Sequence, residues 1–142
     1  SAPLPVFWRK TRTLGLSFST CTQPFSETNR EIGSDIMEVG LGIHGEPGLE
    51  KAKVKPCKDT AKIVLEKILA SIDPENLKTG KKLAILVNNL GAVPPMEMTI
   101  LVKDVFEALP DGVDKYLVGP APLMTSLDMN GISITLMPIN DA

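Results

Sequence analysis

The strongest constraint on the fold is a strand–helix–strand pattern over residues 82–118. Residues 82–87 (Lys-Leu-Ala-Ile-Leu-Val) are almost all apolar, which is typical of a strand covered on both faces. Pro95 suits the first position of a helix, where a missing N–H costs nothing, and residues 114–118 predict the next strand. The apolar face of the helix consists of Met98, Leu101, Val102, Val105 and Leu109. Such a crossover is right-handed in nearly all cases and makes its two strands parallel.

Three further strands and one further helix are expected. Residues 13–19 alternate apolar and small polar side chains, and residues 35–39 and 132–137 are the other short strand candidates. Asp59 offers a side-chain oxygen to cap a helix that Pro74 stops. The apolar face of that helix consists of Ala61, Val64, Leu65, Ile68, Leu69 and Ile72. The predicted fold is α/β, a small mixed β-sheet with flanking helices and one parallel βαβ crossover.

Length and charge narrow the function. A chain of 142 residues suits one compact domain, here residues 13–142 after an irregular lead-in over residues 1–12. With a net charge of −2, the chain does not have the excess of basic residues that is typical of a nucleic-acid-binding protein. No apolar run approaches the roughly 18 residues that a membrane-spanning helix needs. The charges at the start follow the apolar residues, unlike a signal peptide. Two cysteines, Cys21 and Cys57, form no disulfide framework, although one bridge stays open. We therefore expect inert thiols and a cytoplasmic protein.

A glycine-rich loop carries the chain's only histidine, His44. Residues 40–48 contain four glycines, which allow a ligand to approach the backbone closely. The spacing Gly40-x-Gly42-x-x-Gly45 imitates a dinucleotide fingerprint, but the Glu-Pro-Gly that follows would break the helix which that fingerprint requires. No Gly-Lys-Ser/Thr phosphate loop is present. One histidine without a cluster of cysteines or aspartates does not fill a zinc shell, so no metal site is expected.

His44 is the candidate catalytic residue. An unperturbed imidazole is roughly three-quarters neutral at pH 7, and a neutral ring nitrogen can attack a carbonyl carbon. Either Glu38 or Glu46 could fix its tautomer, and the sequence does not decide between them. The alternative is a surface histidine that only caps a turn.

Four stretches, in order, resemble the dihydroxyacetone (glycerone) kinases. Glu38-Val-Gly-Leu-Gly-Ile-His-Gly-Glu-Pro-Gly48 is similar to that family's substrate-histidine motif. Residues 13–21 resemble the strand before it, and Leu86-Val-Asn-Asn-Leu-Gly91 with Met96-Glu-Met98 resembles its Asn-Asn/Gly-Leu-Gly turn and following helix. Residues 118–136 resemble its closing segment. The chain is thereby identified as similar to the C-terminal half of a DhaK-type substrate-binding domain.

The resemblance implies that His44 forms a reversible hemiaminal with the ketone carbon of dihydroxyacetone, with Gly45 beside the substrate. It implies a phosphotransferase with an alcohol acceptor whose partner is an ATP-binding domain or a phosphocarrier subunit, and a possible homodimer. ATP and magnesium would belong to that separate domain, so we expect no cofactor in this part. The family's preceding α/β half supplies a glycine, a histidine and an acid that nothing before Thr13 can replace. We therefore expect the fragment alone to be inactive.

Two other functions stay open. A non-catalytic homologue could sense a ketone and act through a protein partner, and a truncated module could only dimerise. Among the lesser motifs, Asn88, Asn89 and Gly91 line a pocket or simply form a turn. Thr125, Ser126 and Asp128 make polar contacts or cap a turn, and Met96 and Met98 are expected in the core.

Overall fold

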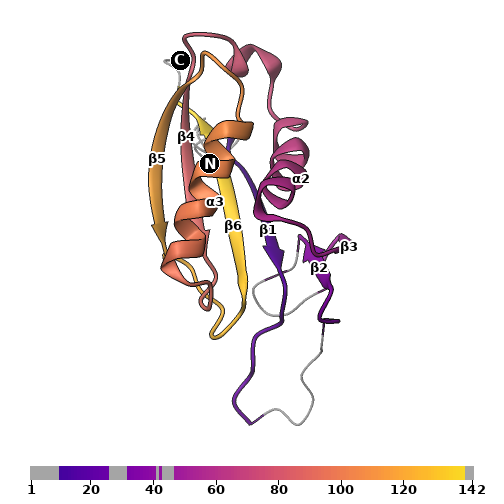
Figure 1. Cartoon of the computed structure of the whole chain (residues 1–142). Coiled ribbons are helices and arrows are strands. Elements are labelled where there is room, and N and C mark those ends of the chain that lie inside the picture. Colours follow the sequence, from indigo (N-terminus) through magenta and orange to yellow (C-terminus); the bar gives the residue numbers. More distant parts are fainter. Residues whose placement is uncertain (1–9, 26–31, 41, 43–46, 140–142) are drawn as a thin grey trace, which may run out of the picture.

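One mixed sheet forms the body of the molecule (Figure 1). The computed structural model describes residues 10–25, 32–40, 42 and 47–139. The strand order is β3-β2-β1-β6-β4-β5. The strands are β1 (Arg12–Ser17), β2 (Ile36–Val39), β3 (Glu50–Lys53), β4 (Lys82–Asn89), β5 (Asp114–Ala121) and β6 (Gly131–Pro138). The helices are α2 (Cys57–Leu69), α3 (Pro95–Ala108) and the 3₁₀ turn η1 (Pro74–Leu77).

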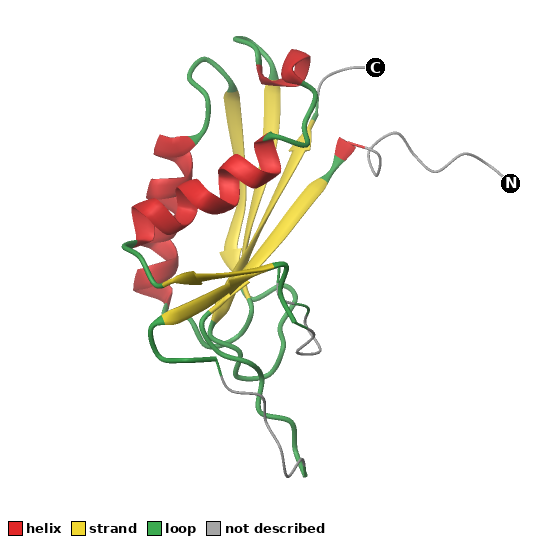
Figure 2. Ribbon diagram, turned by 90° about the vertical axis from the view of Figure 1, so that its right-hand side faces the viewer, coloured by secondary structure: helices red, strands yellow, loops and turns green. Residues whose placement is uncertain are grey.

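The connection from β4 through α3 to β5 is the predicted parallel crossover. β4 and β5 pair in parallel, whereas the pairs β4–β6, β6–β1, β1–β2 and β2–β3 are antiparallel. Both α2 and α3 lie on one face of the sheet, as Figure 2 shows. The predicted α/β class and mixed sheet are therefore confirmed.

The hydrophobic core lies between the sheet and the two helices. Leu83, Ile85 and Val87 of β4 are fully buried there, while the intervening Ala84 and Leu86 are only partly buried. The expectation that β4 is covered on both faces is therefore wrong for this structure, because its side chains alternate between a covered and an open face. Tyr116 of β5 pairs with Ala84 and is half exposed on the open face.

Several element boundaries differ from the expectation. β3 was not expected, because Glu-Lys-Ala-Lys has no apolar alternation; it is an edge strand whose side chains are mostly exposed. α2 begins at Cys57 after Pro56, so Asp59 lies in its first turn and is not the cap. α2 also ends before Ile72, which is nevertheless buried in the core.

Three smaller expectations have mixed outcomes. Met98 is buried in the core, but Met96 is 76% exposed, so its core assignment is wrong. Cys21 and Cys57 are both free thiols. In the part of the chain that the structure describes, no helix has both the length and the apolar character needed to cross a membrane.

Candidate functional site

The predicted site residues His44 and Gly45 lie outside the described residues, as does Glu46. The structure does describe both ends of their loop, through Gly40 on one side and Pro47 and Gly48 on the other. The geometry of the site is therefore built from the strands and side chains that hold these ends.

The loop begins at Gly40, directly after β2. Its N–H donates to the carbonyl oxygen of Gly15 on β1 at 2.6 Å. Gly40 has φ of +79°, and a Cβ there would lie 2.9 Å from Cγ of Leu49. A glycine is favoured here because the left-handed backbone and the adjacent side chain both disfavour a Cβ.

The loop ends directly opposite its start. The N–H of Leu49 donates to the carbonyl oxygen of Val39 at 2.8 Å, and Glu50 then pairs with Val39 in the β2–β3 ladder. The nine residues 40–48 thus leave one strand and return to its neighbour.

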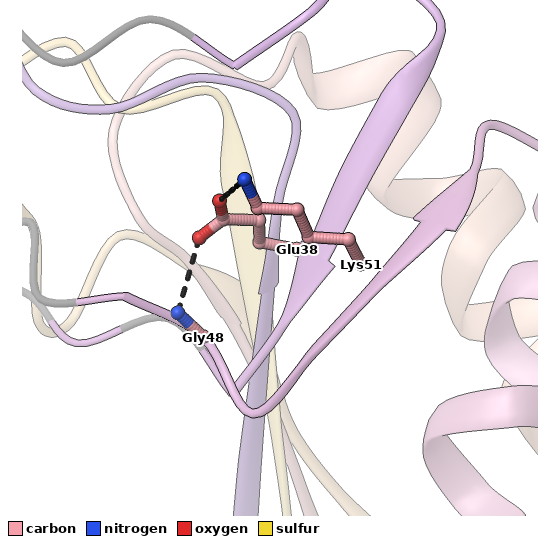
Figure 3. Close-up of polar contacts among 3 residues, drawn as sticks. All are labelled: Glu38, Gly48 and Lys51. Atoms are coloured by element: carbon pink, nitrogen blue, oxygen red, sulfur yellow. Dashed lines mark hydrogen bonds and ion pairs between the residues drawn. The ribbon is translucent and has the colours of Figure 1, made fainter.

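Glu38 joins the loop end to the sheet through its side chain (Figure 3). Its carboxylate is 1% exposed, and Oε2 accepts a hydrogen bond from the N–H of Gly48 at 3.0 Å. Oε1 lies 3.6 Å from Nζ of Lys51, which is directly opposite on β3. Cross-strand partners lie close enough for opposite charges to attract. Glu38, Gly48 and Lys51 are called the loop clamp below.

The loop clamp lies on the face of the sheet away from the helices. Met37 and Val39 point into the core beneath α2, so the intervening Glu38 points the other way. Ser17 of β1, paired with Glu38, faces the same side.

A cavity of about 250 Å³ lies on the opposite, helix-bearing face. Its walls are mainly apolar side chains of β1, β6, α2 and α3, with charge from Lys55 and Glu97. Burial and a hydrogen bond with Asp104 raise the pKa of the Cys57 thiol in its wall to about 12. A thiol that stays protonated is a poor nucleophile, which agrees with the expected inert thiol at this position.

Asn88, a predicted pocket-or-turn residue, is used entirely within the protein. It lies at the end of β4, 2% exposed, and its amide donates to the carbonyl oxygen of Met124 at 2.8 Å and the hydroxyl of Ser133 at 3.2 Å. Its side-chain oxygen accepts from the N–H groups of Leu123 and Met124, both at 2.9 Å. Two donors and two acceptors exhaust the capacity of an amide, so Asn88 has a structural role.

Asn89 and Gly91 likewise form a turn. The side-chain oxygen of Asn89 accepts from the N–H groups of Gly91 at 2.9 Å and Val93 at 3.2 Å, and its amide donates to the carbonyl oxygen of Val93 at 2.7 Å. A Cβ on Gly91 would lie 2.2 Å from the carbonyl oxygen of Leu127. The turn interpretation is confirmed for both residues.

The segment after β5 contains Asp128, whose carboxylate accepts hydrogen bonds from Thr22. The N–H and the hydroxyl of Thr22 donate to it at 2.7 and 2.6 Å. These bonds favour the charged form and lower the pKa of Asp128. The carbonyl oxygen of Ser126 accepts a backbone bond from the N–H of Met129 at 3.0 Å, which closes a turn. The contact of Asp128 with Thr22 is the polar-contact alternative.

The comparison with protein families decides the identity. A family model described as the Dak1 domain matches residues 6–142. The chain belongs to the Dak1 family. A relative from Listeria innocua serovar 6a, "PTS-dependent dihydroxyacetone kinase 1, dihydroxyacetone-binding subunit DhaK", is 40% identical over 134 residues. The match covers 92% of this chain and 39% of that protein, so the Dak1 chain spans well under half of this relative.

Two solved structures share the fold. The dihydroxyacetone kinase of Citrobacter freundii, in complex with AMP-PNP and Mg²⁺, has a TM-score of 0.82 and 32% identity, covering 94% of the Dak1 chain and 24% of its own. A dihydroxyacetone kinase operon co-activator, Dha-DhaQ, has a TM-score of 0.85 and 32% identity, covering 95% and 42%.

Sequence reasoning left one feature of this Dak1 chain undecided. Glu38 and Glu46 were equal candidates to fix the tautomer of His44. The structure shows that Glu38 contacts Gly48, and Glu46 lies outside the described residues. Lys51 was not considered at all, because no strand was expected at β3. The sequence did offer one indication that Glu38 has a particular role: it is a charged residue between the apolar Met37 and Val39 of β2.

Proposed function

We propose that this chain is the substrate-capturing part of a dihydroxyacetone kinase, with His44 as the catalytic residue. A neutral imidazole nitrogen uses its lone pair to form a C–N bond with the ketone carbon of dihydroxyacetone. The C=O π electrons move to the oxygen, which takes a proton, while the ring's other nitrogen loses its proton. The product is a neutral hemiaminal, and the same steps in reverse release the substrate.

The observation that carries this proposal is the Dak1 match, which includes the His44 loop, together with its dihydroxyacetone-binding relative. The described loop ends support it, because Gly40 and Gly48 leave from and return to the sheet beside a buried carboxylate. Glycine has no side chain that would exclude a triose, which supports Gly45 as a residue beside the substrate. Only a carbonyl compound can form the C–N bond, so glycerol and other polyols are rejected by chemistry and not by shape.

The hemiaminal also orients the substrate. Once C2 is bonded to the protein, the terminal hydroxyl that accepts phosphate has few positions left, and such fixed geometry accelerates a bimolecular transfer. The phosphoryl donor is outside this chain's described part. Across residues 10–25, 32–40, 42 and 47–139, no three His, Cys, Asp or Glu side chains gather as metal ligands would. We propose that the phosphoryl donor, either ATP with magnesium or a phosphocarrier subunit, acts from a separate domain or protein.

The test measures capture of the substrate by carbon-13 NMR, with dihydroxyacetone labelled at C2. In the natural full-length gene product that contains this chain, we expect part of the ketone signal to move to a tetrahedral carbon. His44→Ala should abolish the new signal without changing the fold. Identical spectra for the two proteins would refute the covalent role.

A regulatory protein is the second candidate, favoured by the similarity to the Dha-DhaQ co-activator. This function also uses His44 capture, so the two candidates separate at the next step. A kinase forms dihydroxyacetone phosphate when the donor domain or phosphocarrier is added. A regulator forms none and instead binds a protein partner only when dihydroxyacetone is present. A cytoplasmic location and a homodimer remain proposals, testable by fractionation and by light scattering.

A further inference from the structure

We propose that Glu38 is a positioning residue, which holds the His44 loop in the conformation that captures the ketone through its bond to Gly48. This inference rests on the proposed function. Glu46, the other acid near His44 in the sequence, lies outside the described residues, whereas Glu38 is described and contacts Gly48.

The first argument is the burial of a carboxylate. A buried charge is unfavourable unless hydrogen bonds and an opposite charge compensate it. Glu38 is 1% exposed, and the N–H of Gly48 and the ammonium of Lys51 supply that compensation at 3.0 and 3.6 Å. Lys51 is itself 67% exposed, so the acid is the buried member of the pair and the one that contacts Gly48.

The second argument is where the contact falls. The backbone bonds of Gly40 and Leu49 fix the base of the loop, next to the ladder of β2 and β3. Gly48 is the last residue of the loop, four residues after His44, so the carboxylate adds a side-chain attachment to the backbone bonds at this end of the loop. Glycine-rich backbone has many conformations to lose, and each added attachment removes some of them before the substrate arrives.

The third argument separates the loop from the hairpin. β2 and β3 are already joined by a four-residue ladder, and Glu50 on β3 binds Lys67 of α2 at 2.6 Å. The β3 strand thus has its own connection to the helix layer. Loss of Glu38 should therefore disturb the loop more than the hairpin that carries it.

The experiment compares Glu38→Ala, Glu38→Gln and the control Glu50→Gln in the full-length gene product. Glutamine keeps an oxygen for the N–H of Gly48, whereas alanine removes it. Glu50→Gln removes an ion pair from the same hairpin without touching Gly48. The first readout is nitrogen-15 NMR with labelled histidine. His44 is the only histidine of this chain, and its signal in the full-length product is identified as the one that His44→Ala removes.

We expect the histidine of Glu38→Ala to gain ring mobility, while Glu38→Gln and Glu50→Gln stay like the wild type. The second readout is turnover with the phosphoryl donor. A misplacement of about 1 Å can cost on the order of 100-fold, so kcat of Glu38→Ala should fall by about that factor. Glu38→Gln should recover most of the loss, and KM should change less than kcat.

The outcomes are distinguishable. Unchanged histidine mobility and kcat in Glu38→Ala, relative to Glu50→Gln, would overturn the positioning role even if the wild type forms the adduct. No adduct in the wild type would overturn the proposed function, while the mobility measurement still tests the loop clamp. If Glu38→Ala does not fold, Glu38→Asp replaces it, because the shorter carboxylate is drawn away from Gly48 and should lower kcat more than Glu38→Gln does. The opposite order would refute the proposal.

Discussion

Two glycine-containing segments leave the sheet at strand ends, and they are held in different ways. The turn after β4 is fixed along its length, because Asn89 binds the backbone of Gly91 and Val93, and Leu127 packs over Gly91. For the loop after β2, the described contacts lie at its two ends, through Gly40 and the loop clamp. The comparison indicates that glycine provides close backbone packing in the turn, whereas in the loop we propose that it provides access to His44.

The largest effect is expected from Gly91→Ala. Its φ of +148° disfavours a side chain, and the new Cβ would lie 2.2 Å from the carbonyl oxygen of Leu127, which is backbone and cannot rotate away. Unfolding in urea should show a loss of about 3–4 kcal/mol, in the range of strain combined with a core-like clash. A loss below about 1 kcal/mol would show that the turn is as adaptable as the loop.

Asn88→Ala should come next. It leaves the N–H groups of Leu123 and Met124 and the hydroxyl of Ser133 without their partner. Lost bonds of this kind cost about 1–3 kcal/mol when water does not replace them, so a loss of about 2–3 kcal/mol is expected by urea unfolding. His44 adduct formation should survive in the folded fraction. Loss of the adduct without loss of stability would instead make Asn88 part of the binding site.

Gly40→Ala is the matched change in the loop, and its effect should be smaller. The residue also has a positive φ, but the group 2.9 Å from its Cβ is the exposed side chain of Leu49, which can rotate. About 1 kcal/mol is expected, the usual order for a non-glycine residue in this backbone region. Urea unfolding beside Gly91→Ala measures the difference, and equal losses would remove the contrast between the two segments.

The smallest effect is expected on the pH dependence of stability, through Asp128. Hydrogen bonds from Thr22 lower the pKa of Asp128, so the folded state binds its proton less readily than the unfolded chain does. The resulting stability is present above the ordinary value of 3.8 and is lost as the pH falls below it. Urea unfolding between pH 6 and about 3 should therefore be less pH-dependent for Asp128→Asn than for the wild type. The same slope for both proteins would contradict this assignment.

Much of the fold could be predicted from the sequence, because its information is periodic. The apolar spacing of α3 follows directly from which of its faces meets the core, and the parallel crossover follows from the order of the elements. The apolar run of β4 predicted a strand, but not that Ala84 and Leu86 lie on an open face. β3 could not be predicted, because Glu-Lys-Ala-Lys owes its strand conformation to the ladder with β2 and not to its own pattern. Met96 was misplaced because it lies in the first turn of α3, beside the apolar face, at a position that solvent reaches.

The candidate site also has a part that the sequence predicted and a part that only the structure shows. His44 and Gly45 were singled out by composition and resemblance alone, and they remain predictions beyond the described residues.

By itself, the sequence determined the α/β class and the parallel crossover, since these depend on local periodicity. It also predicted, from residue type and resemblance, that the His44 loop is the place for ketone chemistry. Only the tertiary structure decided that Glu38 contacts the loop end and that Lys51 pairs with Glu38. It also decided that the side chain of Asn88 makes hydrogen bonds to the backbone of a distant segment. Those facts depend on strand register and chain return, which place residues far apart in sequence within hydrogen-bond distance.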